Sequence, residues 1–184
     1  MKNIYILGVP RSGKTTFSIL LKKELEDYSL ISLDAVRNAF HYSLPELEMI
    51  NRQSYSRKNI LPRYIAEFVH WNHDISKNAC IVEGGIINLD DIIGEIRNDD
   101  IVICFGHGNH SLEEVVEKIQ EYDTKEDYTY GWSKEKLMNH YYDLSDTDLE
   151  NKKICLQKKY YYIETFENRE QTFSKLLKEI KKLL

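Results

Sequence analysis

Short apolar runs alternate along the chain with longer segments in which apolar residues recur at helical spacing. The runs that predict strands are 4–7, 30–33, 80–82, 101–105 and 160–163. Because the runs 4–7 and 101–105 lack the polar alternation of a half-exposed strand, they predict strands of a parallel sheet buried on both faces. With right-handed crossovers, the order of elements predicts an α/β fold in which helices cover both faces of the sheet.

The segments between the runs predict helices. We expect helices that begin after residue 13, near 35, at 112 and at 168, and a long helix that ends near 77. Two further helical segments are expected over 88–97 and around 134–153. The long helix ending near 77 has its predicted apolar face on Leu61, Tyr64, Ile65, Phe68, Val69 and Ile75. Pro45 interrupts the helical segment before it, and Pro62 predicts a break or a fresh start near its beginning. Three polar pairs predict helix starts: Asn88 with Asp91, Ser111 with Glu114, and Asn168 with Gln171.

The most specific pattern in the chain lies at residues 8–15. They read Gly8-Val9-Pro10-Arg11-Ser12-Gly13-Lys14-Thr15, which fits the Walker A pattern G-x-x-x-x-G-K-[ST] of a phosphate loop. A predicted strand precedes this stretch and a predicted helix follows it, which is the context that the motif requires. The pattern therefore predicts that the protein binds a nucleoside triphosphate.

The residue types of the loop suit phosphate chemistry. Gly8 and Gly13 let the backbone turn tightly and bring its N–H groups against phosphate oxygens, and the helix that follows adds its N-terminal positive charge. Lys14 is predicted to reach the β- and γ-phosphates, and the Thr15 hydroxyl is predicted to hold Mg²⁺. ATP and Mg²⁺ are the expected cofactors. We expect the remaining nucleotide contacts at Pro10, Arg11, Ser12 and Thr16.

In a parallel sheet ligands bind at the carboxyl ends of the strands, which directs attention to Asp34 after the run 30–33. We expect this run beside the phosphate loop. The Asp34 carboxylate is predicted to accept a proton from a substrate hydroxyl or to order Mg²⁺ through water; alternatively, it caps the helix that begins near residue 35. Arg37 lies one turn later and either binds a phosphate or carboxylate of the acceptor or pairs with Asp34 in solvent.

Glu83, Gly84 and Gly85 end the run 80–82 at the same predicted edge. Glycines at a strand end allow a ligand to approach the backbone closely, so we expect all three residues at the acceptor. Glu83 also has the position of a Walker B carboxylate, although the hhhhD form of that motif is absent. Metal binding by Glu83 is therefore a secondary hypothesis.

For several further residues, a structural role is favoured over a functional one. Arg52, Arg57 and Arg63 could lean over an acceptor, but a solvated helix face is the favoured interpretation. His107 and His110 could bind a metal, but their spacing suggests no third ligand, so ordinary loop histidines are favoured.

The polar segment 122–159 is a possible lid. No arginine occurs between Asn98 and Asn168, so the cations of a lid would have to be lysines such as Lys134 or Lys136. Lysine is a poorer bidentate phosphate ligand than arginine. Near this segment Tyr128, Tyr130 and Trp132 could stack on a base or sugar, although half-buried packing is the ordinary role of such side chains.

The composition narrows the class of protein. A chain of 184 residues with 42% hydrophobic and 30% charged residues is sufficient for one domain with a full core. Its net charge of −5 argues against a nucleic-acid coat or a polybasic membrane surface. Cys80, Cys104 and Cys155 form no C-x-x-C pair, which favours a reduced compartment and hence the cytoplasm. We expect no signal peptide and no membrane span, because no apolar run approaches the ~20 residues that a span needs.

Together the phosphate loop, Asp34 with Arg37, and Glu83 to Gly85 resemble the P-loop small-molecule kinases of the adenylate kinase, shikimate kinase and chloramphenicol phosphotransferase type. The resemblance implies a three-layer α/β/α fold with a five-stranded parallel sheet in the order 2-3-1-4-5. It also implies an acceptor-binding helical region over about 35–78 and a lid over about 122–159. In this family Asp34 would be acceptor ligand or base, Gly84 and Gly85 would line the acceptor, and Arg169 would lie near the adenine. The lid arginines usual in the family are missing here.

The leading hypothesis is a cytoplasmic kinase that transfers phosphate from ATP to a small hydroxylated or phosphorylated metabolite, such as a nucleoside or nucleotide. Lys14 and Asp34 are its expected catalytic residues. The alternative is a nucleotide-binding regulatory NTPase without a small acceptor, which the missing lid arginines favour. A kinase acting on nucleic-acid ends is a third class, which the acidic balance disfavours.

Overall fold

The computed structural model of the chain describes residues 1–43, 55–85 and 89–184. Its centre is a parallel sheet in the order β2-β3-β1-β4-β5, which confirms the predicted α/β class and the strand order implied by the resemblance. The strands are β1 (Ile4–Gly8), β2 (Ser29–Ser32), β3 (Cys80–Glu83), β4 (Ile101–Gly106) and β5 (Tyr161–Glu164). β4 is buried along its whole length, as its uninterrupted apolar run predicts, and β3 is buried as well.

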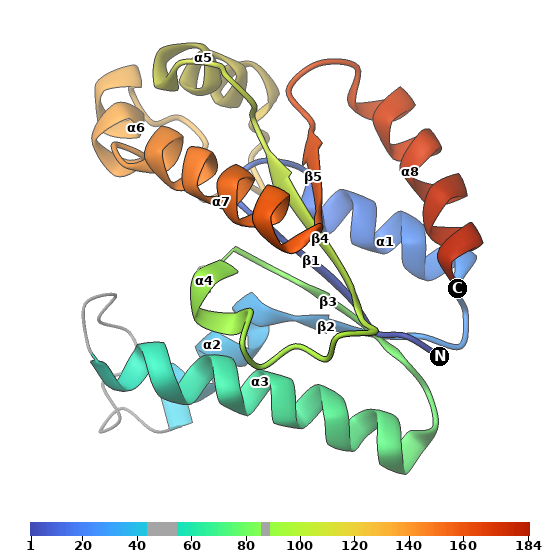
Figure 1. The fold of residues 1–184 in the computed structure, drawn as a ribbon. Coiled ribbons are helices and arrows are strands. Elements are labelled where there is room, and N and C mark those ends of the chain that lie inside the picture. The colour runs from blue at the N-terminus through green and yellow to red at the C-terminus, as the bar shows by residue number, and fades with distance from the viewer. Residues whose placement is uncertain (44–54, 86–88) are drawn as a thin grey trace.

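Helices cover both faces of the sheet (Figure 1). The described helices are α1 (Lys14–Glu24), α2 (Leu33–Ser43), α3 (Tyr55–Ser76), α4 (Leu89–Ile92), α5 (Leu112–Tyr122), α6 (Lys134–His140), α7 (Leu144–Lys158) and α8 (Arg169–Leu183). On one face α1 and α8 bury Phe17 and Phe173 against Phe105 of β4. On the other face α2, α3, α4 and α7 pack around a second core cluster that includes Leu33 and Val69.

A third apolar cluster lies beyond the carboxyl ends of the strands, where α5, α6 and the start of α7 pack together (Figure 1). It is built around Val116, Leu137 and Leu144. The Ser111–Glu114 capping box that the sequence predicts is confirmed: the Ser111 side chain accepts from the Glu114 amide, and the Glu114 side chain accepts from Ser111. This cluster therefore places a separate helical layer over the edge of the sheet where ligands are expected.

Several boundaries differ from the sequence predictions. α3 continues through Pro62, because burying Ile65 and Val69 against the sheet outweighs the loss of one backbone hydrogen bond. The apolar face predicted for this helix is partly wrong, since Tyr64 and Phe68 are half-exposed and Ile75 is 78% exposed.

Other local predictions also need correction. The helical segment predicted over 134–153 is two helices, α6 and α7, and the short helix predicted to reach residue 97 ends at Ile92. Asn168 does precede α8, but its side chain makes no capping hydrogen bond, because its backbone is left-handed. Asn88 and Pro45 lie outside the described residues. Within the described ranges, no helix has the length and hydropathy that a membrane crossing requires.

Candidate functional site

The phosphate loop connects β1 to α1 at the carboxyl edge of the sheet. Gly8 has φ +121°, and a Cβ there would overlap the Phe105 carbonyl, so glycine is required by both conformation and space. Gly13, at φ +88°, precedes the first residue of α1, Lys14. The strand, loop and helix thus meet the structural requirement of the motif, and the N-terminus of α1 opens into the loop.

The carbonyl oxygens of the loop are held by side chains from elsewhere at this edge. His107 Nε2 lies 3.0 Å from Pro10 O, Thr165 Oγ1 donates to Ser12 O at 2.7 Å, and Arg169 Nη2 donates to Arg11 O at 3.3 Å. Because a trans peptide places the next N–H opposite each carbonyl, engaging the carbonyls on one side directs the loop amides to the other side. The loop is therefore preorganised as a nest of N–H groups for an anion.

Lys14 is buried in this nest. Its Nζ donates to Val9 O at 2.5 Å, and Ser12 Oγ donates to the same carbonyl at 2.8 Å. Burial lowers the pKa of Lys14 to about 8, against the opposing effect of the Glu83 carboxylate. A phosphate entering the loop would give this ammonium a stronger partner than a backbone carbonyl.

Thr15 and Glu83 come together across the sheet edge. β3 lies directly beside β1, with Ile6 opposite Glu83, and the Thr15 hydroxyl donates to Glu83 Oε2 at 3.1 Å. A hydroxyl and a carboxylate are oxygen ligands of the kind that Mg²⁺ takes, usually with water and substrate phosphates completing its shell. Among the described residues no group of three or more His, Cys, Asp and Glu could hold a metal. The structure thus brings Glu83 beside Thr15, the residue predicted to hold Mg²⁺, and their two oxygens are of the type that this ion takes.

The described residues enclose a cleft of about 1360 Å³ over the phosphate loop. Asp34, Arg37 and Gly85 line one arm of it, and Pro10, Thr16 and Arg169, for which the sequence predicts nucleotide contacts, also belong to its lining. The prediction that β2 lies beside the phosphate loop is wrong, because β3 separates β2 from β1. Asp34 still reaches the cleft because all these strands end at one edge.

Asp34 lies within the first turn of α2, which begins at Leu33, so it is not the N-cap that the alternative interpretation assumed. Arg37 Nη2 lies 3.7 Å from Asp34 Oδ1, and both side chains remain accessible to a ligand. Gly85 faces the loop, since a Cβ there would lie 2.9 Å from Gly8 O. Gly84 lies behind the cleft lining, where a Cβ would come within 2.6 Å of the Leu33 Cβ.

The opposite arm of the cleft belongs to the helical layer. Residues 123–133, between α5 and α6, fall within the lid predicted over about 122–159, and we call them the lid segment. Arg11 of the phosphate loop pairs with Asp123 and Asp127 of this segment, and its hydrogen bond lowers the pKa of Asp127 to about 2. Tyr122 and Tyr128 line the cleft nearby, and the Tyr128 hydroxyl lies 2.6 Å from that of Tyr141.

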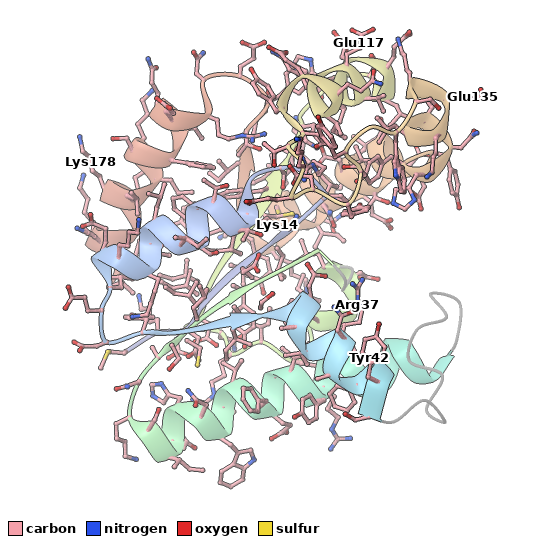
Figure 2. All side chains as sticks on the ribbon, turned by 180° about the vertical axis from the view of Figure 1, so that it is seen from behind. Lys14, Arg37, Tyr42, Glu117, Glu135 and Lys178 are labelled. Atoms are coloured by element: carbon pink, nitrogen blue, oxygen red, sulfur yellow. The ribbon has the colours of Figure 1, made fainter. Side chains whose placement is uncertain are left out.

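The lysines proposed as lid cations point elsewhere. Lys134 pairs with Glu113 and Glu117 of α5, and the Lys136 ammonium lies 3.6 Å from the centre of the Trp132 ring. Figure 2 shows Glu117 at the outer margin of the helical layer, away from Lys14. The cation that this layer does bring to the cleft is Lys118 of α5.

The two loop histidines have structural partners. Because a carbonyl only accepts, His107 Nε2 must carry the proton that it shares with Pro10 O, and burial lowers the pKa of His107 to about 4. Its backbone N–H donates to the buried Asp148 carboxylate at 2.7 Å. His110 stacks on Phe166, with the ring centres 3.6 Å apart. Both rings are thus engaged by the protein.

Of the three arginines considered for the acceptor side, Arg63 is the one whose side chain is described, and it is not among the residues that line the cleft. Arg52 and the Arg57 side chain lie outside the described residues, and Arg63 is exposed on α3. The three cysteines, Cys80, Cys104 and Cys155, are buried and free.

Sequence reasoning missed several residues that shape the site. Thr165 follows β5 as Asp34 follows β2, so the strand-end rule could have found it. The sequence favours His107 as an ordinary loop histidine over a metal ligand, and neither interpretation predicts its contact with the Pro10 carbonyl. No sequence pattern points to Asp123 and Asp127, because acidic residues are frequent in a polar surface segment.

Solved structures with a similar fold include several kinases. A sugar kinase from Janibacter sp. HTCC2649 superposes with a TM-score of 0.64 and 17% identity, over 98% of this chain and 95% of its own. Shikimate kinase from Bacteroides thetaiotaomicron gives 0.58 and 16% over 98% of both chains. Shikimate kinase from Aquifex aeolicus gives 0.56 and 18% over 97% of this chain and 96% of its own. No protein-family model and no curated protein matches the chain.

The fold and the phosphate loop thus define a P-loop α/β protein. The resemblance to P-loop small-molecule kinases is confirmed at the level of the fold across nearly the whole chain. At identities of 16–18% the similarity shows the fold alone, so the chemistry rests on the residues of the site.

Proposed function

We propose that the protein is an ATP-dependent phosphotransferase, a kinase that acts on a small hydroxylated or phosphorylated metabolite such as a nucleoside or nucleotide. The observation that carries this proposal is the extent of the cleft. Its volume of about 1360 Å³ exceeds the ~300–1,000 Å³ typical of a pocket for one small ligand. It also continues from the phosphate loop to Asp34 and Arg37, so a nucleotide and an acceptor would have room side by side.

The phosphate loop would bind the triphosphate. Its amides would face the anion, Lys14 would exchange the Val9 carbonyl for phosphate oxygens, and Arg169, which also lines the cleft, would lie near the nucleoside. Thr15 and Glu83 would hold Mg²⁺, which supplies charge neutralisation of the phosphates when bound. In P-loop NTPases the Walker A backbone and its lysine hold the phosphates in this way, which supports the assignment of a nucleoside triphosphate.

Asp34 would act on the acceptor. In the transfer, the acceptor oxygen forms a bond to the γ-phosphorus as the bond from that phosphorus to the bridging oxygen of ADP breaks, and the hydroxyl proton passes to the Asp34 carboxylate. Arg37, 3.7 Å from Asp34, would orient an acceptor phosphate or carboxylate. Most of the rate acceleration would come from positioning and charge neutralisation in the cleft.

The test is phosphate transfer from γ-labelled ATP to pools of acceptors: nucleosides, nucleoside monophosphates, sugars, cofactor precursors, and aminoglycoside or phenicol antibiotics. We expect one pool to yield a labelled product. The Asp34→Asn variant should lower that transfer by at least about 10²-fold, the smallest effect expected of a general base. Asp27→Asn, an exposed carboxylate between α1 and β2 at the opposite edge of the sheet, is the matched control.

Lys14→Ala should abolish turnover while leaving the fold intact. Its control is Lys178→Ala on α8, which Figure 2 shows far from Lys14. Unchanged turnover in Lys14→Ala would exclude the proposed nucleotide site. Slow phosphate release in every pool, unaffected by Asp34→Asn, would instead support the alternative of a regulatory NTPase without a small acceptor.

A further inference from the structure

Arg11 stands out within the phosphate loop because its backbone is strained. Its φ of +63° lies in the left-handed region, which favours glycine and is unfavourable for a residue with a Cβ. Arg11 keeps this conformation while its carbonyl accepts from Arg169. Strained residues that the surrounding structure maintains cluster at functional sites, so the contacts of the Arg11 side chain are informative.

The Arg11 side chain points toward the lid segment rather than along the loop. Nη1 donates to Asp127 Oδ1 at 2.5 Å, and Nη2 donates to Asp123 Oδ1. These are charge-assisted bonds from both ends of one planar guanidinium, the arrangement for which arginine is better suited than lysine. The Asp123 side chain is 4% exposed, so its pairing with Arg11 is shielded from solvent.

The same two carboxylates organise the lid segment itself. Asp123 ends α5, and its second oxygen accepts from the Thr129 hydroxyl. The second oxygen of Asp127 accepts from the Thr124 amide at 2.8 Å and from its hydroxyl at 3.0 Å. The lid segment is therefore folded around the groups that bind Arg11.

Charge explains why this contact matters for an anionic ligand. Asp123 and Asp127 bring two negative charges to a site built for phosphates, and Arg11 offsets one of them. Without the guanidinium, repulsion between the carboxylates and bound phosphates would favour a lid segment displaced from the loop.

We propose that Arg11 is a positioning residue that ties the lid segment to the phosphate loop and holds that segment over the bound nucleotide. The proposal rests on the proposed function in taking a nucleotide as the ligand of the loop. It assigns Arg11 to the lid, in place of the direct nucleotide contact expected from the sequence.

Matched variants separate the charge from the backbone strain. Arg11→Ala removes the guanidinium and keeps a Cβ at the left-handed position. Arg11→Gly removes the guanidinium and also the Cβ that causes the strain. Asp127→Asn breaks the contact from the other side and leaves an oxygen that can still accept from Thr124. Glu135→Gln makes the same chemical change on α6, at the outer margin of the helical layer (Figure 2), and is the control.

The first measurement is hydrogen exchange of the amides of residues 123–133 in the free protein, which requires no activity. Because hydrogen bonds to charged groups are among the stronger ones in proteins, we expect exchange to accelerate by at least about tenfold in both Arg11 variants and in Asp127→Asn. Glu135→Gln should exchange like the parent protein. If an Arg11 variant fails to fold, the hydrogen exchange of Asp127→Asn still tests the proposal.

The second measurement separates positioning from phosphate binding. In Arg11→Gly, inorganic pyrophosphate should bind within about twofold of the parent protein, because the loop amides and Lys14 remain, while kcat falls by at least about tenfold and Arg11→Lys recovers part of it. Unchanged exchange in both Arg11 variants would overturn the proposal. So would loss of pyrophosphate binding in Arg11→Gly with the exchange of residues 123–133 unaltered. A parent protein that transfers no phosphate would contradict the proposed function alone, because the exchange result does not depend on turnover.

Discussion

The buried ammonium of Lys14 makes nucleotide affinity dependent on pH in a range where most surface groups do not titrate. In the free protein burial lowers the pKa of Lys14 to about 8, so this side chain loses its proton just above neutral pH. A bound phosphate favours the charged form and raises the pKa again. Binding above pH 8 must therefore take up a proton, and the affinity must fall as the pH rises.

The size of the effect follows from the fraction of protein that carries the charge. With a pKa of about 8, roughly nine-tenths of Lys14 is protonated at pH 7 and roughly one-tenth at pH 9. If only the charged form binds phosphate, the dissociation constant should increase by about tenfold between pH 7 and pH 9. Binding at pH 9 should then take up about 0.9 proton per site.

Isothermal titration calorimetry with ATP and Mg²⁺ measures both quantities, since the apparent enthalpy changes with the ionisation enthalpy of the buffer in proportion to the protons taken up. Lys14→Arg is the control, because a guanidinium stays charged over this range. We expect the dependence above pH 8 to disappear in that variant. A dissociation constant that stays constant from pH 7 to pH 9 in the parent protein, or an equal dependence in Lys14→Arg, would refute the reasoning.

Three further predictions concern the support of the phosphate loop. Thr165→Val leaves the Ser12 carbonyl without its 2.7 Å donor and should lower the free energy of unfolding by about 1–3 kcal/mol in urea titrations. His107 has a folded pKa of about 4, so between pH 6.5 and pH 4 the unfolded chain binds a proton that the folded chain does not. Stability should therefore fall by up to about 3 kcal/mol as the pH falls through this range, and less in His107→Gln. Gly85→Ala places a Cβ 2.9 Å from the Gly8 carbonyl oxygen and 3.3 Å from Lys14 Nζ, so the start of the phosphate loop must shift and ATP binding should weaken.

Each of these has a contradicting outcome. Equal stability of Thr165→Val and the parent protein would mean that the Ser12 carbonyl finds another donor. Parallel pH profiles of the parent protein and His107→Gln would show that His107 does not titrate as its burial implies. Unaltered ATP affinity in Gly85→Ala would place the phosphates away from Gly85.

The fold was largely predictable because its signals are local. The apolar runs of β1, β3 and β4 and the Ser111 capping box depend on near neighbours in the chain, and the structure confirms them. Predictions failed where long-range packing competes with a local signal. Pro62 lies inside α3 because the helix is stabilised by its contact with the sheet, which no local signal reports.

The site divides in the same way. The loop residues from Gly8 to Thr15 were recognisable because a phosphate nest needs glycines, a lysine and a hydroxyl at fixed spacing. The Thr15–Glu83 pair was not, because it depends on β3 lying beside β1 rather than on any spacing along the chain. Asp34 was found by the strand-end rule, although the neighbour expected for its strand was wrong.

By itself, then, the sequence determined the class of fold and the phosphate loop, since both are specified by the order and type of residues within short stretches. Only the tertiary structure decided which distant side chains surround that loop: His107, Thr165 and Arg169 on its carbonyls, and Asp123 and Asp127 on Arg11. The physical reason is that a hydrogen bond or ion pair depends on distance in space, and these partners are brought within reach of the loop only when the strands align their carboxyl ends at one edge of the sheet.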